Sequence, residues 1–172
     1  MKRLVTILLA LTLMTGPALA CGNPLLYAML FARYPDAKIV YDSEIENREN
    51  GFLQERKFPA TPELVYHQWS LANATEIANS LNATVTGNLE DSESLLVLLA
   101  DEVYGVRFTG GASAPVMVPL QTMERGAVFD AFTTTNALRA ISAGEIGWQT
   151  AIKRNLVLSD NSSLLVNVPL NQ

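Results

Sequence analysis

Cysteine and histidine are almost absent from this chain of 172 residues, which contains one of each. Structural zinc sites draw most of their four ligands from these two residue types, and a disulfide framework requires paired cysteines. The chain alone therefore lacks the residues for a disulfide-stapled fold or a Cys/His zinc centre. We expect neither a metal nor a cofactor.

Positive charge is also scarce. The chain has 12 Lys and Arg against 17 Asp and Glu, and the cations are scattered singly or in pairs. Neutralising phosphates requires a collected basic face, so we expect no nucleic-acid partner. Apolar residues make up 49% of the chain and charged residues 17%, a composition that predicts a folded chain rather than a disordered one.

The only long hydrophobic run lies at the amino terminus and has the features of an export signal. Lys2 and Arg3 precede an apolar stretch from Leu4 to Met14, and Gly16-Pro17 precedes the small residues of Ala18-Leu19-Ala20. A membrane span needs about twenty apolar residues, which this stretch does not reach. We therefore predict a signal peptide over residues 1–20 and an extracytoplasmic bacterial protein, periplasmic or secreted. The mature residues 21–172 would carry a charge of 10 − 17 = −7.

Cys21 leaves two kinds of processing open. Ala18 and Ala20 suit ordinary signal peptidase, which favours simple secretion, whereas Cys21 after the cleavage point suits lipoprotein processing. Lipidation of Cys21 would anchor the protein to a membrane surface, the only membrane contact that we expect. A redox role for this thiol is disfavoured because the chain has no second Cys to resolve a mixed disulfide.

The first half of the mature chain predicts two helices, a strand and a loop. A helix with Pro24 at its first position covers Leu25 to Ala32 and ends near Tyr34-Pro35. A strand from Lys38 to Tyr41 and a polar loop from Asp42 to Arg56 follow. The acidic residues of this loop do not match a calcium loop, so we expect them to be solvated: Asp42, Glu44, Glu46 and Glu49.

A second helix is predicted from Thr61 to about Asn82. Its apolar stripe contains His67, which we therefore interpret as a neutral core histidine, together with Leu64, Leu71, Ala74, Ala78 and Leu81. Val65, Trp69 and Ala72 form a second apolar ridge on the opposite side. Either another element covers this ridge or Trp69 belongs to a contact surface.

The second half of the chain has the periodicity of strands and short helices. We predict strands at 83–86, 94–100 and 103–108, the last two forming a hairpin at Asp101-Glu102, and an antiparallel pair at 116–120 and 127–133. A short helix after Thr135 or Asn136 ends at Gly144, and a second contains Trp148, Ala151 and Ile152. Asn155 closes this helix before strands at 156–158 and 164–168. The expected fold is a single α+β domain, a mostly antiparallel sheet with about four helices packed on it.

The carboxyl-terminal quarter resembles sterol-carrier-protein-like domains. The resemblance rests on Phe129 to Thr134, Ala137 to Ile141, Ala143 to Ile146, Ala151 and Leu156 to Leu158. The family pattern is strand, short helix, Gly, second helix and strand, and its members hold lipids or other apolar ligands between the sheet and the helices. No individual functional residue transfers, because the matching positions are ones that any buried strand or helix would use.

The residues favour a non-enzymatic role and leave catalysis open. No motif places a nucleophile, a base or paired carboxylates together, so we assign no catalytic residue. The first hypothesis is an interaction or accessory module of the cell envelope, using the ridge of Val65 and Trp69 or the acidic loop as its contact surface. The alternative is a carrier of an apolar, lipid-like ligand, in which the helix Leu25 to Ala32 and the helix of Trp148 close a cavity over the sheet.

Overall fold

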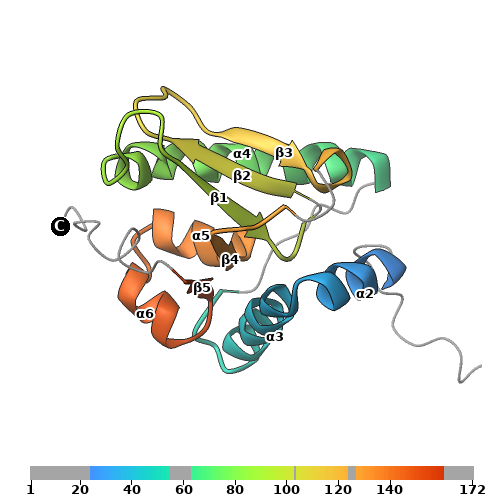
Figure 1. Ribbon diagram of the computed structural model, residues 1–172. Helices are drawn as coiled ribbons and strands as arrows, with labels where there is room; N and C mark the ends of the chain where they lie inside the picture. Colours follow the sequence, from blue (N-terminus) through green and yellow to red (C-terminus); the bar gives the residue numbers. More distant parts are fainter. Residues whose placement is uncertain (1–23, 55–62, 103, 124–126, 161–172) are drawn as a thin grey trace, which may run out of the picture. The chain divides into compact units, whose positions relative to one another are not determined.

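The described residues contain an open five-stranded sheet with helices packed on it (Figure 1). The computed structural model describes residues 24–54, 63–102, 104–123 and 127–160. The predicted signal peptide, Cys21 and the predicted strand at 164–168 lie outside these residues. The elements are α2 (Pro24–Arg33), α3 (Pro35–Glu49), α4 (Glu63–Thr86), β1 (Ser94–Leu99), β2 (Tyr104–Thr109), β3 (Val116–Pro119), η1 (Leu120–Thr122), β4 (Ala131–Thr133), α5 (Thr135–Ser142), α6 (Trp148–Lys153) and β5 (Val157–Ser159).

The strand order is β3-β2-β1-β4-β5. Neighbouring strands are antiparallel except β1 and β4, which run parallel with Val97 opposite Ala131. The α+β fold class with a mostly antiparallel sheet is therefore confirmed, as is the hairpin at Asp101-Glu102. The predicted pairing of 116–120 with 127–133 is wrong, because β3 pairs with β2 while β4 returns to a place beside β1.

The chain divides after Tyr34 into two units, which are described separately. The first contains α2, which begins at Pro24 and ends at Arg33, as the sequence predicts. Its end follows from Pro35, since a proline disfavours the helical conformation of the residue before it. The second unit contains the sheet and all other described helices.

Helix α3 replaces the strand predicted from Lys38 to Tyr41 and most of the loop predicted after it. Its buried residues are spaced three and four apart, which places them on one helical face: Ala37, Val40, Glu44 and Asn47. Burial of this face outweighs the β propensity of Ile39, Val40 and Tyr41. The prediction that this acidic segment is a solvated loop is wrong for Glu44, which is buried. Asp42, Glu46 and Glu49 are exposed as predicted, but they lie on a helix rather than in a loop.

Helix α4 confirms the predicted amphipathic helix and extends it. It continues through the predicted strand at 83–86 as far as Thr86. Its buried stripe reaches Val85, four residues after Leu81, so the last helical turn still buries an apolar side chain. Within this stripe Ala74, Ala78 and Leu81 are buried as expected.

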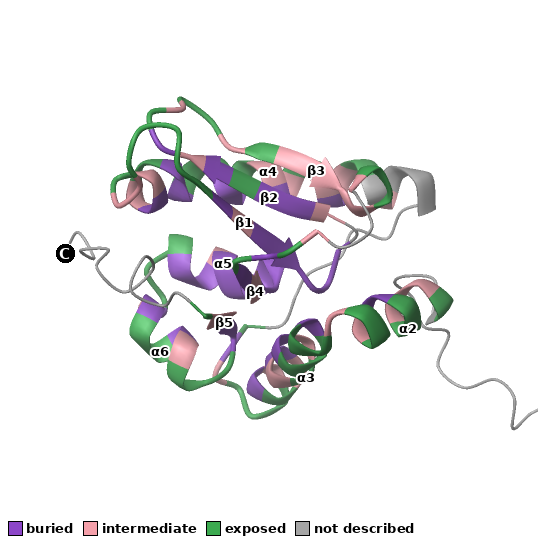
Figure 2. Cartoon of the chain, in the orientation of Figure 1, coloured by how far each residue is buried: buried purple, intermediate pink, exposed green. Residues whose placement is uncertain are grey.

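The hydrophobic core lies between one face of the sheet and the helices α4, α5 and α6 (Figure 2). Side chains on that face come from alternate positions of the strands, for example Val97 and Leu99 on β1 and Val106 and Phe108 on β2. Helix α3 packs against β4 and β5. Its buried Ala37 and Val40 lie outside the main core cluster.

The end of the sheet unit follows the predicted order of strand, helix, Gly, helix and strand. The predicted cap, Thr135 or Asn136, is wrong by one residue or two, because the hydroxyl of Thr134 caps α5 and Thr135 is already helical. Gly144 follows the helix at φ +70°, a backbone conformation that favours glycine. Helix α6 ends before Asn155 at φ +54°. Asn tolerates this left-handed conformation better than most residues, in agreement with its predicted closing role.

Candidate functional site

The residues singled out by the sequence do not form one site. Trp148 is 5% exposed and lies in the core, whereas Trp69 is half-buried on α4 with its ring 6.0 Å from that of Tyr66. The side chains of Val65 and His67 lie outside the described residues, as does Cys21. The structure therefore separates the buried Trp148 from the partly accessible Trp69.

Trp148 lines a small apolar cavity between the sheet and the helices. The cavity has a volume of about 10 Å³ and is also lined by Val85, Leu95, Val97, Phe108, Ala131, Thr133, Leu138 and Val157. The hydroxyl of Thr133 donates to the carbonyl of Leu156 at 2.8 Å, which leaves an apolar surface. An apolar cavity of about 150 Å³ is what takes up a molecule such as benzene, so this cavity has no room for a ligand as it stands.

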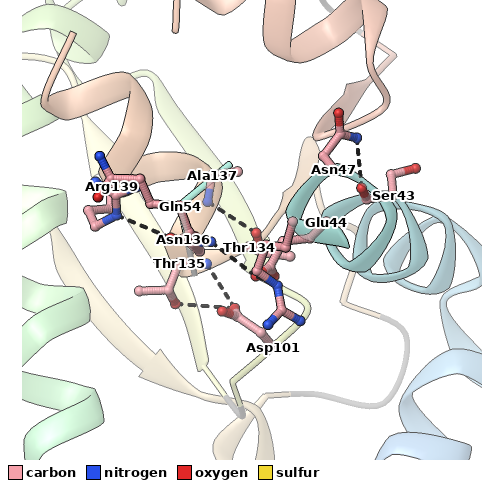
Figure 3. A network of polar contacts seen from close by, with 11 residues as sticks. Ser43, Glu44, Asn47, Gln54, Asp101, Thr134, Thr135, Asn136, Ala137 and Arg139 are labelled. Carbon is pink, nitrogen blue, oxygen red and sulfur yellow. Dashed lines mark hydrogen bonds and ion pairs between the residues drawn. The ribbon is translucent and has the colours of Figure 1, made fainter. Parts of the chain in front are cut away.

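A buried polar network lies at the carboxyl ends of the parallel strands β1 and β4 (Figure 3). Asp101 Oδ1 accepts hydrogen bonds from the backbone N–H of Thr135 at 2.8 Å and from its hydroxyl at 3.1 Å. The hydroxyl oxygen of Thr134 accepts from the backbone N–H of Ala137 at 3.2 Å. These bonds satisfy amide groups in the first turn of α5, which have no partner within the helix.

Asn136 extends this network from α5 to α3. Its Nδ2 donates to Glu44 Oε1 and to the carbonyl of Gln54, both at 3.3 Å, and its Oδ1 accepts from Arg139 Nε at 3.1 Å. Glu44 is 3% exposed, and Arg48 Nε lies 3.2 Å from its Oε1. The buried carboxylate therefore has both a hydrogen-bond donor and a cation close to it.

Two arginines form side-chain contacts at the periphery of the network. Arg139 forms a two-pronged ion pair with Glu145, at 2.6 Å and 3.0 Å, and the hydrogen bond from its guanidinium lowers the pKa of that carboxyl from its usual 4.5. Arg154 donates to Asn47 Oδ1 at 2.9 Å and lies 3.5 Å above the centre of the Phe52 ring. The ion pair of Arg139 is local, six residues along the chain, whereas the contacts of Arg154 join the end of α6 to the distant α3 and the turn after it.

The hydrogen bonds of this network connect α3, the β1–β2 hairpin and α5. Its carboxylates Asp101 and Glu44 accept hydrogen bonds from backbone, amide and hydroxyl groups, and both are buried. In the part of the chain that the structure describes, no group of three or more His, Cys, Asp or Glu is arranged to hold a metal ion. The sequence reasoning missed these residues, although the polar run Thr133 to Asn136 between an apolar strand and helix signals a buried polar cap.

An open pocket lies at the opposite end of β4. Its volume is about 160 Å³, and its lining comes from the start of α3, the approach to β4 and the end of β5: Asp36, Phe129, Asp130, Phe132, Leu158, Ser159 and Asp160. The three carboxylates are exposed, whereas the apolar side chains are buried or half-buried. The pocket thus has an apolar floor and an acidic rim.

One face of α2 exposes apolar side chains to solvent. Leu25 is 66% exposed and Met29 is 64% exposed, and Ala28 and Ala32 are exposed beside them. The spacing of i, i+3, i+4 and i+7 places these four residues on one face, called here the α2 face. No helix within the described ranges is both long and apolar enough to cross a bilayer.

Comparisons of the chain with family models, with curated proteins and with solved structures gave no match.

Proposed function

We propose that this protein is an exported interaction module of the bacterial cell envelope that binds a protein partner through the α2 face. The observation that carries the proposal is the exposure of Leu25 and Met29, at 66% and 64%, on a helix whose first nine residues are uncharged. Large apolar side chains gathered on one face of a helix indicate a surface that another molecule covers. This surface replaces the ridge of Val65 and Trp69 as the favoured contact.

The chemistry of α2 favours a protein groove over a lipid surface. Helices that lie on membranes commonly carry several Lys or Arg, whereas α2 carries only Arg33, in its last turn. Ten residues at about 1.5 Å each give a helix of about 15 Å, half of the hydrocarbon thickness of a membrane. A short apolar helix is well suited to a hydrophobic groove, in which anchors at i, i+3, i+4 and i+7 are read together.

The test compares a variant of the α2 face with a control variant at another exposed apolar residue, both in the mature chain. The double substitution Leu25→Glu and Met29→Glu places charges on the α2 face, and Val128→Glu is the control, since Val128 is 81% exposed and lies in the other unit. Labelled wild-type protein is mixed with envelope fractions together with excess unlabelled competitor, and the complexes are crosslinked only afterwards. Wild-type and V128E protein should displace the bound copy, and L25E/M29E protein should not.

Two results would contradict this function. Equal displacement by L25E/M29E protein would place the contact elsewhere. Cosedimentation of the unlipidated mature protein with phosphatidylethanolamine and phosphatidylglycerol vesicles, lost in L25E/M29E, would make the occupant of the α2 face a lipid surface.

Export and the fate of Cys21 belong to the same proposal. The apolar run at 4–14 and the small residues before Cys21 support cleavage after Ala20. Intact mass of the protein recovered from its host distinguishes the two forms of processing. A mass starting at an unmodified Cys21 supports simple secretion, a diacylglyceryl addition supports a lipoprotein, and a mass that includes residues 1–20 contradicts both.

The second candidate function is transport of an apolar ligand. It is favoured by the apolar cavity beside Trp148, which lies between sheet and helices as the resemblance to sterol-carrier-protein-like domains leads us to expect. Binding would require α5 and α6 to move outward, because the cavity volume is about 10 Å³. Native mass spectrometry with added palmitic acid tests this. A one-to-one adduct that changes the fluorescence of W69F protein but not of W148F protein supports transport. If no adduct forms, transport of palmitic acid is excluded.

A further inference from the structure

The open pocket between α3, β4 and β5 has side chains suited to a cation, and no residue of the α2 face lines it. We propose that it binds an alkylammonium group, the chemistry of a lysine side chain or of a small free amine. The structural basis is the combination in one cavity of an apolar floor and three carboxylates at its rim. The proposal does not depend on the proposed function, because all lining residues belong to the second unit.

The floor of the pocket suits a short alkyl stem. Phe132 and Leu158 are directly opposite each other on the antiparallel strands β4 and β5, so both side chains project from the same face of the sheet. The ring of Phe129 lies 5.9 Å from that of Phe132, centre to centre, and is buried. Methylene groups of a ligand would be removed from water on this surface, which favours binding. The aromatic rings would also attract the nearby cation.

The rim of the pocket is suited to one positive charge. Asp36 lies in the first turn of α3, Asp130 precedes β4 and Asp160 follows β5. The lining contains no Lys or Arg to neutralise them. A carboxylate attracts an ammonium at close range, and three around one cavity add their fields.

The three carboxylates differ in what else they bind. Asp130 Oδ2 accepts the backbone N–H of Leu96 at 2.7 Å, which fixes its position against β1. The side chains of Asp36 and Asp160 have no hydrogen-bond or ion-pair partner among the residues that the structure describes. A ligand cation would therefore interact with Asp36 and Asp160 without breaking a bond of the fold.

The size of the pocket limits the ligand. Sites for whole small molecules occupy about 300 to 1,000 Å³, whereas this cavity is about 160 Å³. It has room for a single amine on a few carbons rather than for a large cofactor. The carboxylates are not arranged to hold a metal ion together, so an organic cation fits better than an inorganic one.

The experiment uses n-butylammonium as the probe and the complete mature chain as the protein. Binding is followed by the ¹H–¹⁵N chemical shifts of the amides of residues 129–132 and 158–160. The test variant carries Asp36→Asn and Asp160→Asn, neither of which removes a described side-chain contact. The control variant carries Glu46→Gln and Glu76→Gln, which likewise remove two negative charges, from exposed helical surfaces away from the pocket.

The wild-type and control proteins should bind n-butylammonium with the same affinity, and the D36N/D160N protein should bind about tenfold or more weakly. n-Butanol, which has the same stem without the charge, should not shift these amides. Raising the salt concentration should weaken binding because the rim is exposed. Equal affinity of the test and control variants, or an absence of shifts at these residues, would overturn the proposal.

A second arm distinguishes the two sources of the amine. A blocked Gly-Gly-Lys-Gly-Gly peptide is titrated beside its norleucine counterpart. Shifts with the lysine peptide alone, lost in D36N/D160N, identify the pocket as a receptor for a basic segment of a protein. Shifts with n-butylammonium and with neither peptide identify it as a site for a small free amine.

Discussion

At the scale of single residues, the most informative are the buried polar ones. Asp101 is 5% exposed and Asn136 is 3% exposed, yet each has at least one hydrogen-bond partner on another element. A buried polar group that keeps its partners costs little, but loss of one partner leaves the other unsatisfied in a low dielectric. The network therefore specifies how α3, the β1–β2 hairpin and α5 meet.

Replacement of Asp101 tests this role. Asp101→Ala should lower the free energy of unfolding by about 1 to 3 kcal/mol, because the buried N–H of Thr135 loses its acceptor. Asp101→Asn should cost less, since an amide oxygen can still accept that bond. Urea denaturation measures both, and Asp91→Ala, on an exposed turn, is the control. Equal stability of D101A and wild-type protein would show that the cap does not support the fold.

Glu145 gives a prediction about pH. The hydrogen bond from Arg139 lowers its pKa in the folded state below the usual 4.5, so the stabilisation is present above that pH and is lost as the pH falls through the folded pKa. Both side chains are about one-third exposed, at 33% and 32%, so the effect should stay within about 1 kcal/mol. Glu145→Gln should therefore be less stable than wild type at about pH 7, and this difference should be smaller at about pH 3. The same difference at both pH values, with Glu46→Gln as reference, would contradict the assignment.

At the scale of secondary-structure elements, the turn between α5 and α6 depends on its backbone conformation. Gly144 has φ +70°, and a Cβ built there would meet no atom within 4 Å. Gly144→Ala should therefore cost about 1 to 2 kcal/mol through the backbone alone, and Gly144→Asn should cost less. Thermal unfolding compares the two. Equal losses for Ala and Asn would indicate a steric clash instead.

The sequence predicts elements best where local signals agree. Pro24, Gly144 and Asn155 mark helix ends correctly because their backbone preferences act within a few residues. Helix α3 was misassigned because Glu44 and Asn47 occupy its buried face, which hides the helical period of its apolar residues. The place of β4 beside β1 depends on contacts between distant segments, and a pattern read along the chain does not contain them.

The candidate sites were harder to predict than the fold. Each draws on segments far apart in the chain, as when Asp36, Asp130 and Asp160 meet around one pocket. Glu44 and Asp101 appeared in the sequence only as loop or hairpin acids. Trp148 was identified correctly as a residue of the helix beside the sheet, because its apolar spacing with Ala151 and Ile152 is a local pattern.

At the scale of the whole molecule, the packed core of the sheet unit contrasts with the exposed α2 face. Leu138 is 4% exposed and lines the core cavity, so Leu138→Ala should cost about 2 to 5 kcal/mol of unfolding free energy. Leu25→Ala should change it by less than about 0.5 kcal/mol, because Leu25 is 66% exposed. Denaturant titrations measure both. A loss for L25A as large as that for L138A would mean that the α2 face packs inside the protein.

Hydrogen exchange of the isolated envelope complex shows whether a partner covers the α2 face, because it reports which backbone amides are protected. We expect slower exchange over residues 24–33 in the complex than in the free protein, with α4 around Trp69 unchanged. Unchanged exchange over residues 24–33 together with slowing around Trp69 would contradict this expectation and assign the contact surface to α4.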